Sequence, residues 1–210
     1  MDKPPVILRD YWRSSASYRV RLALAIKGID YQRVPVDLVA GEQRGEANAR
    51  ANAQGFVPTL EVGEVRLIQS LAIVEWLDAT WPEPRLVPAD PLAAARVRAA
   101  GLVVACDIHP LNNLRVLRWL ETELGAPKDA RDRWYWHWIE EGLAALERMA
   151  GEAFTGDTPT LADICLVPQL FNARRFDVDL ARYPTLVARD AMLAELPAFR
   201  AAHPDAVKPV

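Results

Sequence analysis

Two adjacent serines stand just before a segment with helical spacing, and their position makes them candidates for chemistry. Ser14 and Ser15 precede apolar residues that repeat at helical intervals between residues 18 and 27. A hydroxyl at a helix N-terminus offers a hydrogen-bond donor beside the positive end of the helix dipole, which stabilises an anion such as a thiolate. Serine is also a common N-cap that needs no ligand. The spacing alone therefore leaves both interpretations of Ser14 open.

Two further helix starts carry polar side chains. Gln69 and Ser70 begin a segment of helical spacing, where unpaired backbone amides and a hydroxyl suit a carboxylate ligand. A plain N-cap at Ser70 is the alternative. Thr160 and Asp163 have the spacing of a capping box, in which each side chain bonds the other's backbone amide, and we interpret that pair as structural.

Four basic side chains are candidates for binding an anionic substrate: Arg13, His109, Arg115 and Arg175. Carboxylates need positive partners, and arginine binds them with two parallel hydrogen bonds. For each of these arginines taken singly, a solvated surface charge is the interpretation that its residue type favours. His109 and Arg115 are six residues apart, so ideal helical spacing does not stack them on one face.

Composition excludes several classes of protein. Of the 210 residues, 51% are hydrophobic and 25% are charged, which is too apolar for a disordered chain. The net charge is −3, and no Lys/Arg block indicates nucleic acid or a membrane surface as a partner. No apolar run approaches the roughly 18 residues of a membrane span. Two cysteines far apart in the sequence and the lack of an apolar leader indicate a cytoplasmic protein.

Several motifs are missing from the sequence. The ten glycines form neither GxGxxG nor a phosphate-binding loop, so a dinucleotide or nucleoside triphosphate site is not indicated. The three histidines lie apart without HExxH or CxxC motifs, and we expect no metal. No GxSxG turn presents a nucleophilic serine.

Hydrophobic periodicity divides the chain into two parts. Strand-like and helix-like runs alternate through residues 1–83 in the order βαβ and then ββα. Prolines interrupt the pattern after residue 81, because proline lacks an amide donor. Beyond residue 92 the pattern is helical, with helices expected at residues 93–120, 131–149, 161–175 and 185–202. We therefore predict an α/β domain over residues 1–83 and an all-helical domain over residues 90–210.

This order of elements, with Pro58 opening the third strand, resembles the cytosolic glutathione transferase fold over essentially the whole chain. Residues 12–21, Trp-Arg-Ser-Ser-Ala-Ser-Tyr-Arg-Val-Arg, are similar to the zeta-class signature S-S-C-x-[WH]-R-V-R. Gln69-Ser70, residues 107–113 and residues 160–169 also match the family. The resemblance implies a thioredoxin-like first domain, an all-α second domain and a homodimer. Ala16 stands where the signature has cysteine, so a role for that thiol is not available here.

The resemblance also implies glutathione as the cofactor and assigns residues to it. Ser14 would stabilise the thiolate, and the backbone of Val57, before a cis-proline at Pro58, would pair with the cysteinyl backbone. Gln69 and Ser70 would bind the γ-glutamyl carboxylate. The implied glutathione-binding residues are Ser14, Ser15, Val57, Pro58, Gln69, Ser70, His109, Asn113 and Arg115. The implied catalytic residues are Ser14 with Arg13, His109 and Arg175, the last three holding carboxylates or an enolate oxygen.

The expected activity is glutathione-dependent cis–trans isomerisation of maleylacetoacetate to fumarylacetoacetate. In the mechanism that the family implies, thiolate addition leaves a single bond that rotates before elimination. Maleylpyruvate isomerisation is the nearest alternative, because the same segments occur in both bacterial types. A zeta-type conjugating or dehalogenating transferase would need an apolar pocket more than cations. Ala16 favours a further alternative, a non-catalytic glutathione-binding protein, whereas Ser14, Gln69 and Ser70 speak against it.

Overall fold

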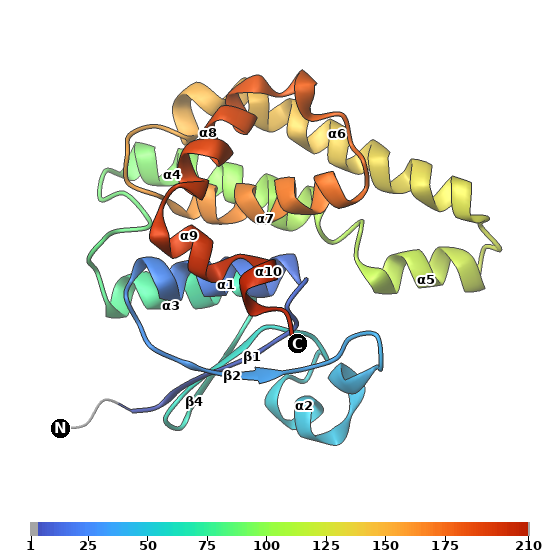
Figure 1. Ribbon diagram of the computed structural model, residues 1–210, viewed down its shortest axis with the longest axis horizontal. Coiled ribbons are helices and arrows are strands. Elements are labelled where there is room, and N and C mark those ends of the chain that lie inside the picture. The colour runs from blue at the N-terminus through green and yellow to red at the C-terminus, as the bar shows by residue number, and fades with distance from the viewer. Residues whose placement is uncertain (1–3, 210) are drawn as a thin grey trace. The chain divides into compact units, whose positions relative to one another are not determined.

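A computed structural model describes residues 4–209 of the chain, which form two compact units (Figure 1). The first unit contains the described residues up to Leu86 together with those from Ala194 onward. The second unit contains residues Val87–Leu193. None of the helices within residues 4–209 combines the length and apolarity that crossing a membrane requires.

The first unit is built on a mixed four-stranded sheet. Its strands are β1 (Val6–Asp10), β2 (Gln32–Pro35), β3 (Thr59–Val62) and β4 (Val65–Ile68). Their order is β2-β1-β3-β4, with β1 and β2 parallel and the other pairs antiparallel. A parallel pair needs a crossover, which the helix between β1 and β2 supplies. The predicted βαβ-ββα order is therefore confirmed.

Helices α1 (Ser15–Ile26) and α3 (Ser70–Thr80) pack against each other beside this sheet (Figure 1). The buried apolar residues of α1 and the sheet, such as Leu22 and Leu60, form the core between them. The polar segment after β2 forms a short turn η1 (Glu42–Arg44) and α2 (Glu46–Ala51).

The second unit is helical throughout its described elements. They are α4 (Pro91–Leu102), the π-helical turn η2 (Val103–Ile108), α5 (Leu114–Thr122), α6 (Lys128–Ala153), α7 (Leu161–Arg175), η3 (Leu180–Arg182) and α8 (Pro184–Ala194). The core lies where α4 packs on α6 and α7. At Gly142 of α6, an added Cβ would lie 2.2 Å from Cγ1 of Ile108, so only glycine permits η2 to approach this closely.

Two predicted helices are interrupted. The helix expected at residues 93–120 ends with η2 and restarts at α5, because Pro110 lacks an amide donor and Asn113 caps the new helix. The helix expected at residues 185–202 is divided between α8 and α9 (Pro197–Ala202), and a further helix, α10 (Pro204–Val207), follows. Each of α9 and α10 begins with a proline at its first position, where the missing amide proton costs no helical hydrogen bond.

The C-terminal helices are grouped with a different part of the chain than the predicted domain boundary implies. The sequence places residues 90–210 in one domain, whereas the structure groups the residues from Ala194 onward with the first unit. The physical cause is long-range packing, since α9 lies against α1 and the guanidinium of Arg21 donates to the carbonyl of Ala202 at 3.1 Å. Local hydrophobic periodicity does not predict such a long-range contact.

Candidate functional site

The loop between β1 and α1 presents Ser14 at the start of a helix. Ser14 is the N-cap of α1, and its Oγ accepts a hydrogen bond from the Ser17 amide at 3.2 Å. A hydroxyl can accept and donate at once, so its own proton remains available to an anion at the helix N-terminus. Capping and anion stabilisation are thus compatible roles. Ser15 follows as the first helical residue and is buried.

Arg13 is held by the two aromatic residues that precede it. Its Nε and Nη2 donate to the Tyr11 hydroxyl at 3.2 and 2.8 Å. Its Cζ lies 5.0 Å from the ring centroid of Trp12. Both contacts restrain the plane of the guanidinium, and such restraint lowers the entropy cost of binding a carboxylate.

The start of α3 does not have the plain Ser70 cap that the sequence leaves open as an alternative. The N-cap is Gln69 rather than Ser70, and no side-chain hydrogen bond caps the helix. Gln69 has φ 69° and ψ 113°, a region that non-glycine residues seldom occupy, and residues in such regions cluster at functional sites. Its Nε2 donates to Oε1 of Gln54 at 2.6 Å. The first amides of α3 therefore remain without a side-chain cap, as an anion-binding helix start requires.

Ser70 is oriented by a buried arginine from the neighbouring helix. Nη1 of Arg19, a residue only 2% exposed, donates to the Ser70 Oγ at 3.2 Å. A guanidinium has no acceptor, so the Ser70 hydroxyl accepts this bond and keeps its own proton for another partner. A positive charge and a hydroxyl donor thus lie together at the N-terminus of α3, and they fit an anionic group such as a carboxylate.

Val57 and Pro58 lie in the same unit, immediately before β3. Their peptide bond is cis, as the family resemblance implies. Pro58 is buried, whereas Val57 is half-buried. The structure thus brings Arg13, Ser14, Ser15, Val57, Pro58, Gln69 and Ser70 into one unit.

The remaining predicted residues belong to the second unit. His109 directly follows η2, and Asn113 caps α5 by accepting from the Arg115 amide at 3.1 Å. Arg115 is exposed in the first turn of α5. Arg175 is the last residue of α7, is exposed, and has its Cζ 5.6 Å from the ring centroid of Phe176.

Tyr135 of α6 connects the regions around these residues within the second unit. Its ring stacks on Phe176 with centroids 3.8 Å apart, and its hydroxyl and the Asn172 side chain lie within hydrogen-bond distance at 2.8–3.0 Å. Its carbonyl accepts from Nδ2 of Asn112, in the turn between His109 and α5, at 3.3 Å. Tyr135 is buried, and it supports Phe176, the residue against which Arg175 lies.

Two family models match the chain. A model of the glutathione S-transferase N-terminal domain covers residues 4–79, and one of the C-terminal domain covers residues 129–204. Maleylacetoacetate isomerase of Rhizobium meliloti (strain 1021) is 50% identical over 208 residues, which are 97% of this chain and 98% of that protein. The holo structure of a maleylpyruvate isomerase, described as a bacterial zeta-class glutathione S-transferase, matches with TM-score 0.93 and 45% identity over 96% of this chain and 98% of that one. The chain belongs to the zeta class of the glutathione S-transferase family.

Another solved relative of this zeta-class transferase carries ligands. Maleylacetoacetate isomerase from Anaeromyxobacter dehalogenans 2CP-1 has glutathione bound in its active site, with TM-score 0.89 and 44% identity over 99% of both chains. A second structure of that protein, with TM-score 0.88 and 43% identity, covers 99% of this chain and 98% of its own. It holds dicarboxyethyl glutathione and citrate in the active site.

Two residues that support the predicted site of this transferase were missed by sequence reasoning. Tyr11 holds the guanidinium of Arg13, and Arg19 holds the Ser70 hydroxyl. A signal for Arg19 was present, because it lies within a run of apolar helical residues that the structure buries. Among residues 4–209, no group of three or more His, Cys, Asp or Glu side chains is arranged to hold a metal ion.

Because the phenol of Tyr135 is buried, the folding stability of the transferase is expected to depend on pH in the alkaline range. Burial raises the pKa of Tyr135 from 10.0 to about 12, against the smaller opposing effects of Asn172 and Arg175. The folded state thus favours the neutral phenol. The stability that this preference contributes is fully present below about pH 10 and is lost as pH rises towards about 12. The loss is on the order of 2 to 3 kcal/mol.

Tyr135→Phe is expected to reduce this alkaline loss. Urea unfolding of both proteins between about pH 9 and about pH 12 measures it. Burial also raises the pKa of Tyr31 and of Tyr183, but both remain in the variant, so the difference between the two pH profiles reports on Tyr135. Parallel profiles for the two proteins would show that Tyr135 does not contribute.

Proposed function

We propose that this chain catalyses the glutathione-dependent cis–trans isomerisation of maleylacetoacetate to fumarylacetoacetate. The observation that carries the proposal is its similarity over almost the full length to an enzyme named maleylacetoacetate isomerase, at 50% identity. The polar groups at the starts of α1 and α3 support it, because they suit a thiolate and a carboxylate, the two anionic groups that glutathione would bring to these helices.

Bound glutathione supplies a thiolate whose reversible addition to the cis double bond leaves a single bond able to rotate. Ser14 donates its hydroxyl proton to the sulfur and keeps the thiol ionised near neutral pH. Gln69 and Ser70, with the amides of α3, bind the γ-glutamyl carboxylate, and Arg19 adds positive charge behind Ser70. The backbone of Val57 pairs with the cysteinyl backbone of the peptide.

The other proposed glutathione contacts come from Ser15 in the first unit and from His109, Asn113 and Arg115 in the second. The substrate is a dicarboxylate, so its recognition needs cations. Arg13, His109 and Arg175 are the proposed groups that hold its carboxylates or the enolate oxygen, where negative charge develops during the reaction. Arginine suits this role because its planar fork matches a carboxylate.

The compartment we propose is the reducing cytoplasm, and the assembly a homodimer. Cys106 is exposed and Cys165 is buried, and no disulfide joins them. The lack of a disulfide between these two residues agrees with a reducing environment. The homodimer follows from the family resemblance.

A paired turnover assay tests the proposal. The loss of maleylacetoacetate and of maleylpyruvate is measured, each with and without glutathione. We expect glutathione-dependent turnover of maleylacetoacetate with the higher kcat/KM. Preference for maleylpyruvate would support the second candidate, which the similarity to the zeta-class maleylpyruvate isomerase favours. Binding of glutathione without turnover of either substrate would reject isomerase activity and leave a conjugating or dehalogenating transferase, or a non-catalytic binding protein.

A further inference from the structure

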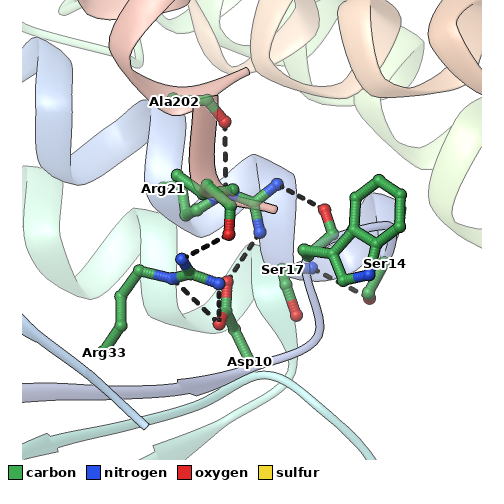
Figure 2. Close-up of polar contacts among 8 residues, drawn as sticks. Asp10, Ser14, Ser17, Arg21, Arg33 and Ala202 are labelled. Atoms are coloured by element: carbon green, nitrogen blue, oxygen red, sulfur yellow. Dashed lines mark hydrogen bonds and ion pairs between the residues drawn. The ribbon is translucent and has the colours of Figure 1, made fainter. Parts of the chain in front are cut away.

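One buried carboxylate, that of Asp10, is shared by two arginines behind the loop that carries Ser14 (Figure 2). Asp10 ends β1 and is 0% exposed. Its Oδ2 accepts from Nη1 of Arg21 at 2.6 Å, and its Oδ1 accepts from Nη2 and Nε of Arg33 at 2.9 and 3.2 Å. Removing two ionised side chains from water is costly, and direct hydrogen bonds of this kind offset the cost.

Both arginines also donate to backbone carbonyls outside their own helix or strand. Nη2 of Arg21 donates to the Trp12 carbonyl at 3.0 Å, and its Nε donates to the Ala202 carbonyl at 3.1 Å. Nη1 of Arg33 donates to the Val207 carbonyl at 2.7 Å. The cluster of Asp10, Arg21 and Arg33 therefore connects the end of β1, the serine loop (residues 11–14, between β1 and α1) and the C-terminal helices α9 and α10 (Figure 2).

Trp12 connects this cluster to the residues of the proposed site. Its carbonyl is bound by Arg21, and its ring lies 5.3 Å from Nζ of Lys208 and 5.0 Å from Cζ of Arg13. Only one residue separates Trp12 from Ser14, the N-cap of α1. A displacement of the Trp12 backbone would therefore move both Arg13 and the Ser14 hydroxyl. Misplacement of a catalytic group by about 1 Å can lower the rate by as much as about 100-fold.

We propose that Asp10, Arg21 and Arg33 are positioning residues for Ser14, and that they hold the serine loop in place by fastening it to the C-terminal segment. This inference rests on the proposed role of Ser14. The C-terminal segment thereby helps to position a residue of the proposed glutathione site. The cluster acts through the backbone of Trp12, and none of its three side chains contacts the reacting atoms.

The test removes Arg33, the most exposed member of the cluster, and compares it with a matched variant. The side chain of Arg33 is 24% exposed, and that of Arg9 is 26% exposed in an ion pair with Glu61 in the same sheet. Arg33→Met therefore removes an arginine–carboxylate pair behind the serine loop, and Arg9→Met removes a similar pair elsewhere. Thermal unfolding of both variants checks that they fold and lose comparable stability.

The readouts are the pKa of the bound glutathione thiol, from the ultraviolet absorbance of its thiolate, and kcat and KM. We expect Arg33→Met to raise this thiol pKa and to lower kcat/KM by about threefold to tenfold. The loosened loop displaces the Ser14 hydroxyl by less than a full misplacement, so the rate falls by only a part of the largest loss. We expect Arg9→Met to leave both unchanged. A folded Arg33→Met protein with an unchanged thiol pKa and unchanged kcat/KM would overturn the proposal.

Arg33→Lys separates positioning from simple charge. A lysine keeps the positive charge, but its single ammonium group lacks the planar fork that bridges Asp10 and Val207. We expect the lysine variant to behave as Arg33→Met does, and full rescue by lysine would overturn the positioning role. If the wild-type protein lowers the thiol pKa of glutathione but turns over no maleylacetoacetate, the proposed function fails while this inference stands. A wild-type protein that does not bind glutathione would overturn both.

Discussion

Replacing Ser14 with alanine is expected to lower kcat/KM of the glutathione-dependent reaction by roughly 10-fold to 100-fold, because a hydrogen bond to a charged group contributes about 1.5 to 3 kcal/mol. The Ser14 Oγ already accepts from the Ser17 amide, so its proton is the group available to the thiolate. The pKa of the bound thiol should rise by about one to two pH units for the same reason.

The alanine variant also loses a helix cap, so the control must reproduce that loss elsewhere. Asp90 caps α4 by accepting from the Ala93 amide at 2.8 Å, in the other unit of the chain. Asp90→Ala should cost about 1 kcal/mol of stability, as Ser14→Ala does through its cap, but should leave the thiol pKa unchanged. Normal turnover by Ser14→Ala, with the thiol still ionised near neutral pH, would contradict the role of Ser14.

Replacing Arg189 with leucine is expected to destabilise the helical unit by about 3 to 5 kcal/mol, since it leaves a buried carboxylate without its cation. Asp163 is 0% exposed and accepts from Nε and Nη2 of Arg189 at 2.7 and 2.9 Å. The predicted capping box at Thr160 is present, with the Thr160 amide donating to Asp163 at 2.8 Å. The sequence predicts only the cap, which contributes about 1 kcal/mol. The arginine makes the same aspartate the centre of a larger network.

Arg96→Leu is the matched control for this stability measurement. Arg96 pairs with Glu152 at 3.0 Å in the same unit, but the two side chains are 43% and 64% exposed, and such surface pairs contribute less than about 1 kcal/mol. Urea unfolding followed by far-ultraviolet circular dichroism measures both variants. The Arg189 variant should unfold at a clearly lower urea concentration. Equal midpoints for the two variants would show that the buried pair does not stabilise the fold.

Much of the architecture and two helix caps could be predicted from the sequence alone. The βαβ-ββα order, the interruption after residue 81 and the bounds of α7 follow from periodicity and proline, which act over a few residues. Ser14 as a cap and the capping box at Thr160 are equally local, since a cap bonds amides two or three residues away. The zeta-class signature then assigned roles that no spacing rule could have supplied.

Only the tertiary structure decided which distant groups support these positions. Nothing near Arg21 in the sequence indicates that its guanidinium reaches the carbonyls of Trp12 and Ala202, or that the C-terminal helices join the first unit. The same holds for Arg19 on Ser70. A charged side chain in an apolar helix is buried only where partners from elsewhere in the chain converge on it, because an unpaired buried charge is too costly. Those partners are set by the packing of whole elements rather than by local spacing.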